Sequence, residues 1–358
     1  MINVTKTFFP PIAEYQQQVQ RIWDNQWLTN RGALVKELEE KLKEYLSVSN
    51  ILVMNNGTIP IQIALKILGN EGEIITTPFS YVATTAAIVW EHCTPVFVDI
   101  HPEYLTIDET KIEAAITSKT TCILATHVFG NPCNLEAIEA IAAKHNLKVI
   151  YDAAHAFGVT YNNKSIFDYG DVSTCSFHAT KLFHTGEGGA LFCEDDSLRH
   201  KMIYSHNFGH NGPLDFHGLG INGKISELSG AMGLAVLPHM EFILNQRKQV
   251  VDWYAEHLDF SKVKSIKIRE NTQWNYSYYP VIFETEAQLL KVQAVLNKQQ
   301  IVPRRYFYPS LNTIEYTKGD AMPISESIAS RILCLPLYHS LNEIEVKKIT
   351  NLINSIIY

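Results

Sequence analysis

The pattern of apolar and polar residues predicts helices at the start of the chain and alternating strands and helices after them. Apolar side chains recur every three or four residues between Ile12 and Trp23 and again between Ala33 and Leu46, which is typical of amphipathic helices. From residue 51 onward, short apolar runs alternate with stretches of helical spacing, which favours βαβ units, a mostly parallel sheet and hence an α/β fold. The expected strands are 51–54, 73–77, 95–99, 121–126, 147–151, 172–175 and 191–193, and the expected helices are 59–68, one that ends near 91, 107–116, 134–145 and 195–205.

The last third of the chain follows a different pattern. Two helices are expected first, and a mixture of strands and helices follows residue 261. We therefore expect a large α/β domain over 1–240, which includes the N-terminal helices, and a small C-terminal α+β domain over 241–358. The elements expected in this part are helices over 224–237, 239–257, 286–298 and 341–357 and strands over 276–283 and 332–335.

Composition and charge place the chain among ordinary globular proteins. It has 358 residues, of which 46% are hydrophobic and 19% are charged, enough to bury a sizeable core. The formal net charge of −7 argues against nucleic acid as a partner. No apolar run is long enough to span a membrane, and the first residues lack the pattern of a secretory signal. We therefore expect no membrane partner and a cytoplasmic location.

Neither the cysteines nor the histidines predict a metal site, and we expect none. The six cysteines form no C-x-x-C pair, and the histidines between His200 and His217 match no usual ligand spacing. Residues 218–223 fit G-x-G-x-x-G, but they follow a His- and Gly-rich loop late in the chain. Because that glycine pattern binds dinucleotides only directly after a strand at the start of a βαβ unit, a nicotinamide-dependent dehydrogenase is disfavoured.

Two polar clusters after expected strands carry the candidate chemistry. Asp152 follows the apolar run 147–151, and Lys181 lies 29 residues later, shortly after the run 172–175. Ligands of α/β folds bind at the C-terminal ends of strands. Pyridoxal phosphate (PLP) needs a lysine that forms a Schiff base and an acid for its pyridinium nitrogen. Taken singly, Asp152 also fits a helix cap and Lys181 a surface lysine, but together they indicate this cofactor.

A glycine turn after the first expected strand is a second candidate for cofactor binding. Gly57 and Thr58 lead from strand 51–54 into a helix, and Pro60 falls in its first turn, where proline is tolerated. The N-terminus of a helix presents free N–H groups and a partial positive charge. Gly57 and Thr58 are therefore candidate phosphate ligands.

These clusters resemble the DegT/DnrJ/EryC1/StrS family of PLP-dependent nucleotide-sugar aminotransferases, and the resemblance covers nearly the whole chain. The family pattern D-x-A-(Q/H)-A-x-G matches 152–158, S-F-x-x-x-K matches 176–181 and G-(E/D)-G-G matches 186–189. The resemblance implies a PLP fold type I aminotransferase, with Lys181 as the cofactor-binding lysine and proton carrier and Asp152 as the partner of the pyridine nitrogen. Position 181 is not the histidine found in the family's sugar dehydratases.

The resemblance also implies further cofactor ligands. It places Tyr81 against the pyridine face, His155 near the 3′ oxygen of the ring and the hydroxyl of Ser176 at the phosphate. Asn222, in the family segment G-x-N-x-(R/K)-x-x-E, would reach the phosphate of the other subunit in a homodimer. Lys224 stands where relatives more often have arginine, and it keeps the charge without the bidentate geometry. Tyr81 and His155 also fit ordinary core residues.

The substrates that the resemblance implies are keto sugars on a nucleoside diphosphate, with glutamate as amino donor. The stretches 178–189 and 304–312 look closest to bacterial enzymes that convert dTDP-4-keto-6-deoxy-D-glucose into dTDP-4-amino-4,6-dideoxy-D-glucose for O-antigen or related lipopolysaccharide synthesis. Two alternatives stay open: amination of a 3-keto or another 4-keto sugar, and a non-catalytic PLP-binding regulatory protein. The candidate substrate contacts are Arg31, His127, Lys224, Arg305 and Tyr306.

Overall fold

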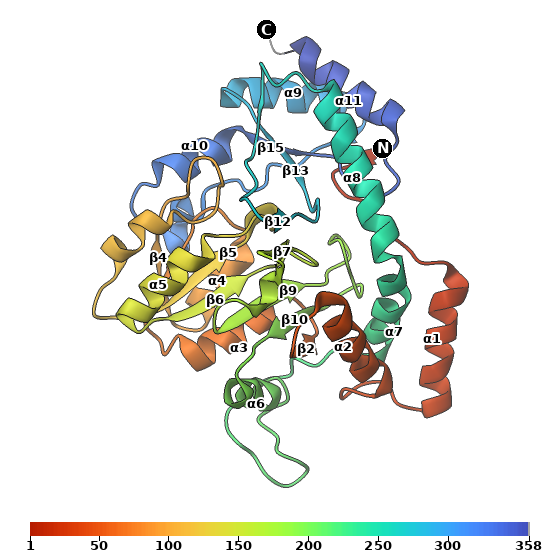
Figure 1. The fold of residues 1–358 in the computed structure, drawn as a ribbon, viewed down its shortest axis with the longest axis vertical. Coiled ribbons are helices and arrows are strands. Elements are labelled where there is room, and N and C mark those ends of the chain that lie inside the picture. The colour runs from red at the N-terminus through yellow and green to blue at the C-terminus, as the bar shows by residue number, and fades with distance from the viewer. Residues whose placement is uncertain (357–358) are drawn as a thin grey trace.

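A seven-stranded sheet lies at the centre of the computed structural model, which describes residues 1–356 (Figure 1). The strand order is β2-β10-β9-β6-β5-β3-β4. Neighbours from β9 to β4 run parallel, whereas β10 is antiparallel to both β9 and β2. The expected mostly parallel α/β sheet is confirmed. Its strands are β2 Ile51–Met54, β3 Glu73–Thr76, β4 Thr94–Phe97, β5 Thr120–Thr126, β6 Lys148–Asp152, β9 Val172–Ser176 and β10 Gly189–Phe192.

Helices cover both faces of this sheet because successive side chains along a strand point to opposite faces. Val53 and Ile123 belong to the core shared with α2, α5 and α7, while Leu52 and Leu124 belong to the core shared with α3, α4 and α6. The sheet is therefore the middle layer of three. The helices are α1 Ile12–Asn25, α2 Ala33–Leu46, α3 Thr58–Leu68, α4 Val82–Trp90, α5 Leu135–His145, α6 Asp196–Ser205 and α7 Glu227–Val236.

A smaller lobe with its own core lies at the top of Figure 1. The long helix α8 connects the two cores, because Ile243 packs in the large one and Val250 and Tyr254 pack in the small one. The division of the chain at residue 240 remains a prediction. The elements of this part are α8 Met240–His257, β11 Lys264–Ser265, β13 Tyr279–Ile282, α9 Glu286–Lys298, β14 Ile301–Val302, α10 Pro323–Arg331, β15 Ile332–Leu335 and α11 Glu343–Ile356.

The structure differs from the sequence-based expectation in several elements. The helix expected over 107–116 is replaced by two 3₁₀ turns, because Asp108 accepts hydrogen bonds from the backbone and hydroxyl of Thr110 and holds a tight turn. Ile357, the end of the last expected helix, lies outside the described residues. No helix within residues 1–356 is long and apolar enough to cross a bilayer. Strands too short for a periodic pattern were missed: β1 Ile2–Asn3, which pairs with β14, and the sheet of β7 Thr160–Tyr161, β8 Lys164–Ser165 and β12 Thr272–Gln273.

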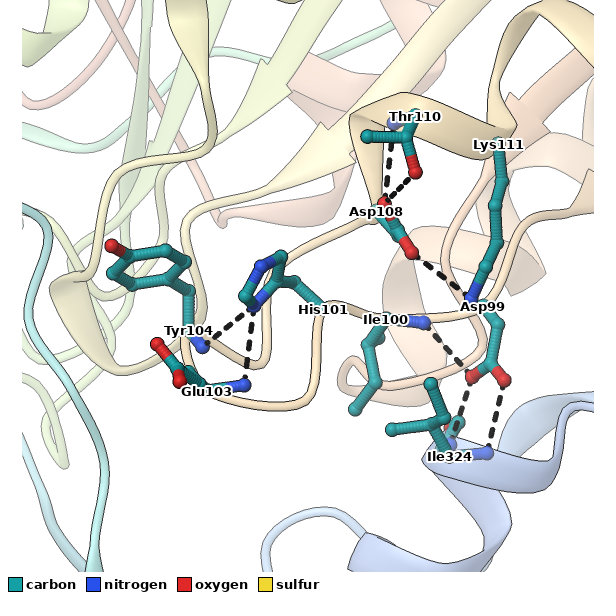
Figure 2. Close-up of polar contacts among 10 residues, drawn as sticks. Asp99, Ile100, His101, Glu103, Tyr104, Asp108, Thr110, Lys111 and Ile324 are labelled. Atoms are coloured by element: carbon teal, nitrogen blue, oxygen red, sulfur yellow. Dashed lines mark hydrogen bonds and ion pairs between the residues drawn. The ribbon is translucent and has the colours of Figure 1, made fainter.

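Asp99 ties the large sheet to the C-terminal part of the chain, as Figure 2 shows. It is buried just beyond β4. One carboxylate oxygen accepts the N–H groups of Ile100 and Ser325, both at 2.8 Å, and the other accepts that of Ile324 at 2.9 Å. The last two N–H groups lie in the first turn of α10, where they have no partner within the helix. A carboxylate at this end also complements the helix dipole.

Replacing Asp99 with alanine is expected to lower the free energy of unfolding by about 2 kcal/mol, since it leaves buried N–H groups without a partner. Urea denaturation measures the change. The control is Asp195→Ala at the exposed start of α6, where the carboxylate caps one N–H, that of Leu198. We expect the control to lose about 1 kcal/mol or less. Equal losses in the two variants would contradict the special role of Asp99.

Candidate active site

A cavity of about 400 Å³ lies at the C-terminal ends of the parallel strands. Thr126, Asp152 and Ser176 are the last residues of β5, β6 and β9, and all three line it. Because β5, β6 and β9 run parallel, their ends meet at one edge of the sheet, where α/β folds bind ligands. The C-terminal part of the chain closes the cavity with Tyr278, Arg304, Tyr306 and Phe307.

Asp152 is a buried carboxylate in the wall of this cavity. One oxygen accepts the hydroxyl of Thr84 at 2.6 Å, and the other accepts the N–H of Ala154 at 3.1 Å. Burial raises the pKa of Asp152, and the bonds from Thr84 and Ala154 and the charge of Lys181 act in the opposite direction. No helix begins after Asp152, so the alternative of a helix cap is wrong.

The amine of Lys181 lies inside the same cavity. It lies 5.8 Å from the ring centre of Tyr278 and makes no hydrogen bond or ion pair with any residue in 1–356. Burial lowers the pKa of Lys181, while the negative charge of Asp152 raises it. The surface-lysine alternative is therefore wrong. An amine with a lowered pKa can carry protons near neutral pH.

His155 presents a defined hydrogen-bond donor to the cavity. Its Nδ1 accepts the N–H of Phe129 at 3.2 Å, which assigns the ring proton to Nε2. Burial, followed by the charge of Lys181, lowers the pKa of His155 well below its usual value. The ring lies parallel to that of Phe307 at 5.6 Å and edge-on to that of Tyr278 at 4.9 Å. These contacts hold a neutral imidazole whose Nε2–H is the donor left for a ligand.

The start of α3 reaches the cavity through Asn56, Gly57 and Thr58. The side chain of Asn56 already accepts the N–H groups of Thr58 and Ile59, at 2.8 and 2.9 Å, so part of the expected anion site is occupied by the chain itself. The hydroxyls of Thr58 and Ser176 remain. A Cβ on Gly57 would lie 2.7 Å from the Cβ of Ser176, so only glycine lets these two segments approach so closely.

This arrangement fits pyridoxal phosphate. Asp152 and Lys181 line one cavity, yet they form no ion pair with each other, which leaves room for a group between them. An aromatic cofactor with a cationic ring nitrogen and a reactive aldehyde suits an acid on one side and an amine on the other. Thr58 and Ser176 would hold its phosphate, and the Nε2–H of His155 would donate to a ring oxygen.

Two further expected residues line the cavity and two others do not. Tyr81, just before α4, keeps 58% of its side chain exposed at the cavity, and Tyr306 lies beside Lys181 there. Asn222 pairs with Asn207 in the loop after α6, and the amine of Lys224 lies 4.5 Å from the ring centre of Phe208. Neither of these two residues lines the cavity of its own chain as described.

Three expected substrate contacts lie outside the cavity, each with a partner of its own. Arg31 pairs with the buried Glu39 at 2.6 Å. Arg305 pairs with Glu286 at 2.6 Å. His127 is fully buried: its Nδ1 accepts the N–H of Cys133 and its pKa falls to about 3, because burial disfavours the charged ring. These side chains serve packing and local ion pairs in the chain as described.

Arg304 is the cation that sequence reasoning missed. Arg304 lines the cavity, and its guanidinium makes no hydrogen bond or ion pair within residues 1–356, whereas the neighbouring Arg305 pairs with Glu286. The backbone of Arg304 forms an antiparallel β-bridge with that of Cys334. Successive residues of such an extended segment point to opposite sides. Knowing which side faces inward would have required the fold.

Metal-binding side chains do not gather at this site. Within residues 1–356, no group of three or more His, Cys, Asp or Glu side chains is arranged to hold a metal ion. All six cysteines are free and buried, so none forms a disulfide. The rings of His200 and His217 lie edge to face with their centres 4.8 Å apart, so these two histidines make a packing contact.

Comparisons with known proteins point to one family. The family model described as DegT/DnrJ/EryC1/StrS aminotransferase matches residues 12–354. The chain is 41% identical to a dTDP-4-amino-4,6-dideoxy-D-glucose transaminase of Escherichia coli over 98% of each chain, and 40% identical to one of Shigella dysenteriae over 99% of each. A crystal structure of DesI with its TDP-sugar product has a TM-score of 0.92 at 29% identity, covering 99% of this chain and 92% of that one.

Proposed function

This chain belongs to the DegT/DnrJ/EryC1/StrS aminotransferase family, whose members use pyridoxal phosphate, and we propose that it moves an amino group from glutamate to dTDP-4-keto-6-deoxy-D-glucose. The product is dTDP-4-amino-4,6-dideoxy-D-glucose. The observation that carries amino transfer is that one cavity holds both Asp152 and the amine of Lys181, which has no hydrogen-bond or ion-pair partner within residues 1–356. The names of the two relatives near 40% identity support the sugar.

Each residue of the cavity has a defined task in this proposal. Bound pyridoxal phosphate supplies an electron sink for the charge left when a proton leaves the donor carbon. Lys181, whose pKa is lowered by burial, takes that proton and returns it to the neighbouring carbon. Asp152 holds the positive charge of the ring nitrogen through a charge-assisted hydrogen bond. In the second half of the reaction the same residues act in reverse on the keto sugar.

The open guanidinium of Arg304 suits an anionic group at the cavity mouth. Both proposed substrates are anionic, glutamate through its carboxylates and the nucleotide sugar through its diphosphate. Arginine binds such planar or branched anions through two parallel hydrogen bonds. Tyr306, His178 and Glu187 also line the cavity, and their polar groups would pair with sugar hydroxyls.

Product analysis tests the substrate. Purified protein with PLP and glutamate is incubated with dTDP-4-keto-6-deoxy-D-glucose or with its 3-keto isomer, and the amino sugar is identified by mass and NMR spectroscopy. Faster turnover of the 4-keto sugar is expected. Preference for the 3-keto isomer would move the proposal to the alternative within the family. Bound cofactor without turnover of either sugar or of glutamate would favour the regulatory protein instead.

We also propose a homodimer in which the loop between α6 and α7 reaches a second copy. This loop, residues 206–226, projects from the body of the chain (Figure 1) and carries Asn222 and Lys224. Trp23 and Trp27 expose 64% and 53% of their side chains, and apolar surface of this kind commonly marks an interface. Mixing Lys181→Ala chains with Asn222→Ala chains tests it: partly restored activity is expected, and none if each site is complete alone.

The cytoplasm is the location that the proposal assigns to this enzyme. Six free cysteines without a disulfide suit a reducing compartment. The amino sugar would be consumed in O-antigen or related lipopolysaccharide synthesis. Deleting the gene from its host should remove the amino sugar from surface glycans while leaving the parent deoxysugar nucleotide in the cell, and an unchanged glycan would contradict this assignment.

A further inference from the structure

Three buried hydroxyl groups are hydrogen-bonded in series, and the last of them donates to the carboxylate of Asp152. Thr126 donates to Ser80 over 3.2 Å, the hydroxyls of Ser80 and Thr84 lie 2.8 Å apart, and Thr84 donates to Asp152 over 2.6 Å. The three hydroxyl-bearing side chains are at most 4% exposed. They come from three different segments: the end of β5, the turn after β3 and the first turn of α4.

The carboxylate fixes the direction of the hydrogen bonds in this series. An ionised carboxylate can only accept, so the single proton of Thr84 points to Asp152. The hydroxyl of Thr84 must then accept from Ser80, which in turn accepts from Thr126. All three protons therefore point toward Asp152. Hydrogen bonds aligned in this way polarise one another and strengthen the last bond of the series.

Thr84 does not line the cavity, unlike the other residues of this series. Thr126, Ser80 and Asp152 line the cavity, whereas Thr84 is fully buried behind it. Thr84 therefore reaches a cofactor in that cavity only through the two residues to which it is hydrogen-bonded, Asp152 and Ser80. Of these two, Asp152 is the charged group proposed for the ring nitrogen.

We propose that Thr84 is a positioning residue that holds Asp152 ionised and correctly oriented for the ring nitrogen of the cofactor, with Ser80 and Thr126 reinforcing its hydrogen bond. The inference deepens the proposed function and rests on it. Asp152 sits in a cavity wall where burial favours the neutral acid, and an acid in that form cannot hold a cation. The hydroxyl of Thr84 and the N–H of Ala154 are the hydrogen-bond donors that oppose this, assisted by the charge of Lys181.

The neighbouring residue Thr85 provides a matched control. It lies on the same helix, is 1% exposed and carries a hydroxyl with no hydrogen-bond partner among the described residues. Replacing threonine with valine keeps the shape and removes the hydroxyl at either position. A general effect of placing valine in α4 would appear in both variants, whereas an effect through Asp152 would appear only in Thr84→Val.

The test uses wild type, Thr84→Val, Thr84→Ser and Thr85→Val, each loaded with PLP. In Thr84→Val we expect about tenfold weaker PLP binding and about tenfold lower kcat, because a hydrogen bond to a charged group is lost. We expect the acid side of the kcat profile to move up by about one pH unit, since Asp152 now takes up a proton more readily. Thr84→Ser should restore the wild-type values, and Thr85→Val should keep them.

Further measurements distinguish a failure of this inference from a failure of the proposed function. Lys181 and Cys175 are the titratable groups that interact electrostatically with Asp152, and His155 shares the cavity with it; every variant retains these three residues. Ser80→Ala should give a smaller shift than Thr84→Val, because it leaves the last bond of the series intact. Equal profiles for Thr84→Val and Thr85→Val, or no rescue by serine, would overturn the inference. Absence of a PLP absorbance band in wild type would instead overturn the proposed function.

Discussion

Lys181→Ala is expected to abolish amino transfer, with kcat at least about 10³-fold below wild type, since the variant loses both the covalent link to the cofactor and the group that moves the proton. Absorbance would show PLP bound without the lysine-linked band. Turnover is measured with glutamate and the keto sugar. Lys181→Arg should be equally inactive, because a guanidinium keeps its proton and forms no such link. Lys119→Ala, on an exposed loop, is the control and should retain full activity.

Stability separates this catalytic role from a structural one. Burial lowers the pKa of Lys181, so the folded protein binds fewer protons there than the unfolded chain between the lowered and the usual pKa. Stability from this site therefore rises as the pH increases through that window, and at neutral pH the buried amine is a cost. Cofactor-free Lys181→Met should unfold at the same temperature as wild type or higher. A clear loss of stability would mean that the lysine supports the fold.

Asp152→Asn is expected to bind PLP but to lose most of its transaminase activity, by about 10³-fold in kcat. The amide keeps one oxygen that can accept the hydroxyl of Thr84, but its NH₂ group cannot accept the N–H of Ala154 as the second carboxylate oxygen does. It carries no charge, and the ring nitrogen loses its charge-assisted partner. The measurements are PLP affinity, kcat and the unfolding temperature of the cofactor-free protein. Near-normal turnover would remove Asp152 from the mechanism.

The direction of the pKa shift of Asp152 predicts how Asp152→Asn changes the stability of the cofactor-free protein. Burial raises its pKa, so ionisation disfavours the cofactor-free fold, and stability from this site is lost as the pH rises through the raised pKa. A neutral amide removes this cost and loses the bond from Ala154, so the cofactor-free variant should be about as stable at pH 7 as wild type. Asp168→Asn is the control: burial raises the pKa of that carboxyl to about 6, but it lies outside the cavity. It should show a similar stability effect with unchanged kcat.

Asp152 and Lys181 could be proposed from the sequence because it shows where they stand relative to the expected strands. Asp152 and Lys181 each follow an apolar run, and parallel strands bring the ends of such runs to one edge of a sheet. The hydroxyls near Asp152 could not be predicted in this way. Thr84, Ser80 and Thr126 come from three segments, and only the packing of α4 against the strand ends brings them together.

Among the expected substrate contacts, Tyr306 lines the cavity, whereas Arg31, His127 and Arg305 do not line it in their own chain. Residue type and position along the sequence do not show which way a side chain points. Arg305 was chosen over Arg304, although an extended segment turns alternate residues to opposite sides. His127 directly follows β5 and Asp152 ends β6, yet the ring of His127 turns into the core and stacks on Tyr151 at 4.6 Å.

The absorbance spectrum of the purified protein, before and after glutamate, is the sharpest test of whether Lys181 binds PLP for amino transfer. Wild type and Lys181→Ala are each incubated with PLP and recorded across the visible range. We expect a band from the lysine-linked cofactor in wild type alone, which glutamate bleaches and the keto sugar restores. A protein that shows no bound chromophore after PLP is added, or a band that persists in Lys181→Ala and ignores glutamate, would contradict the assignment of this cavity.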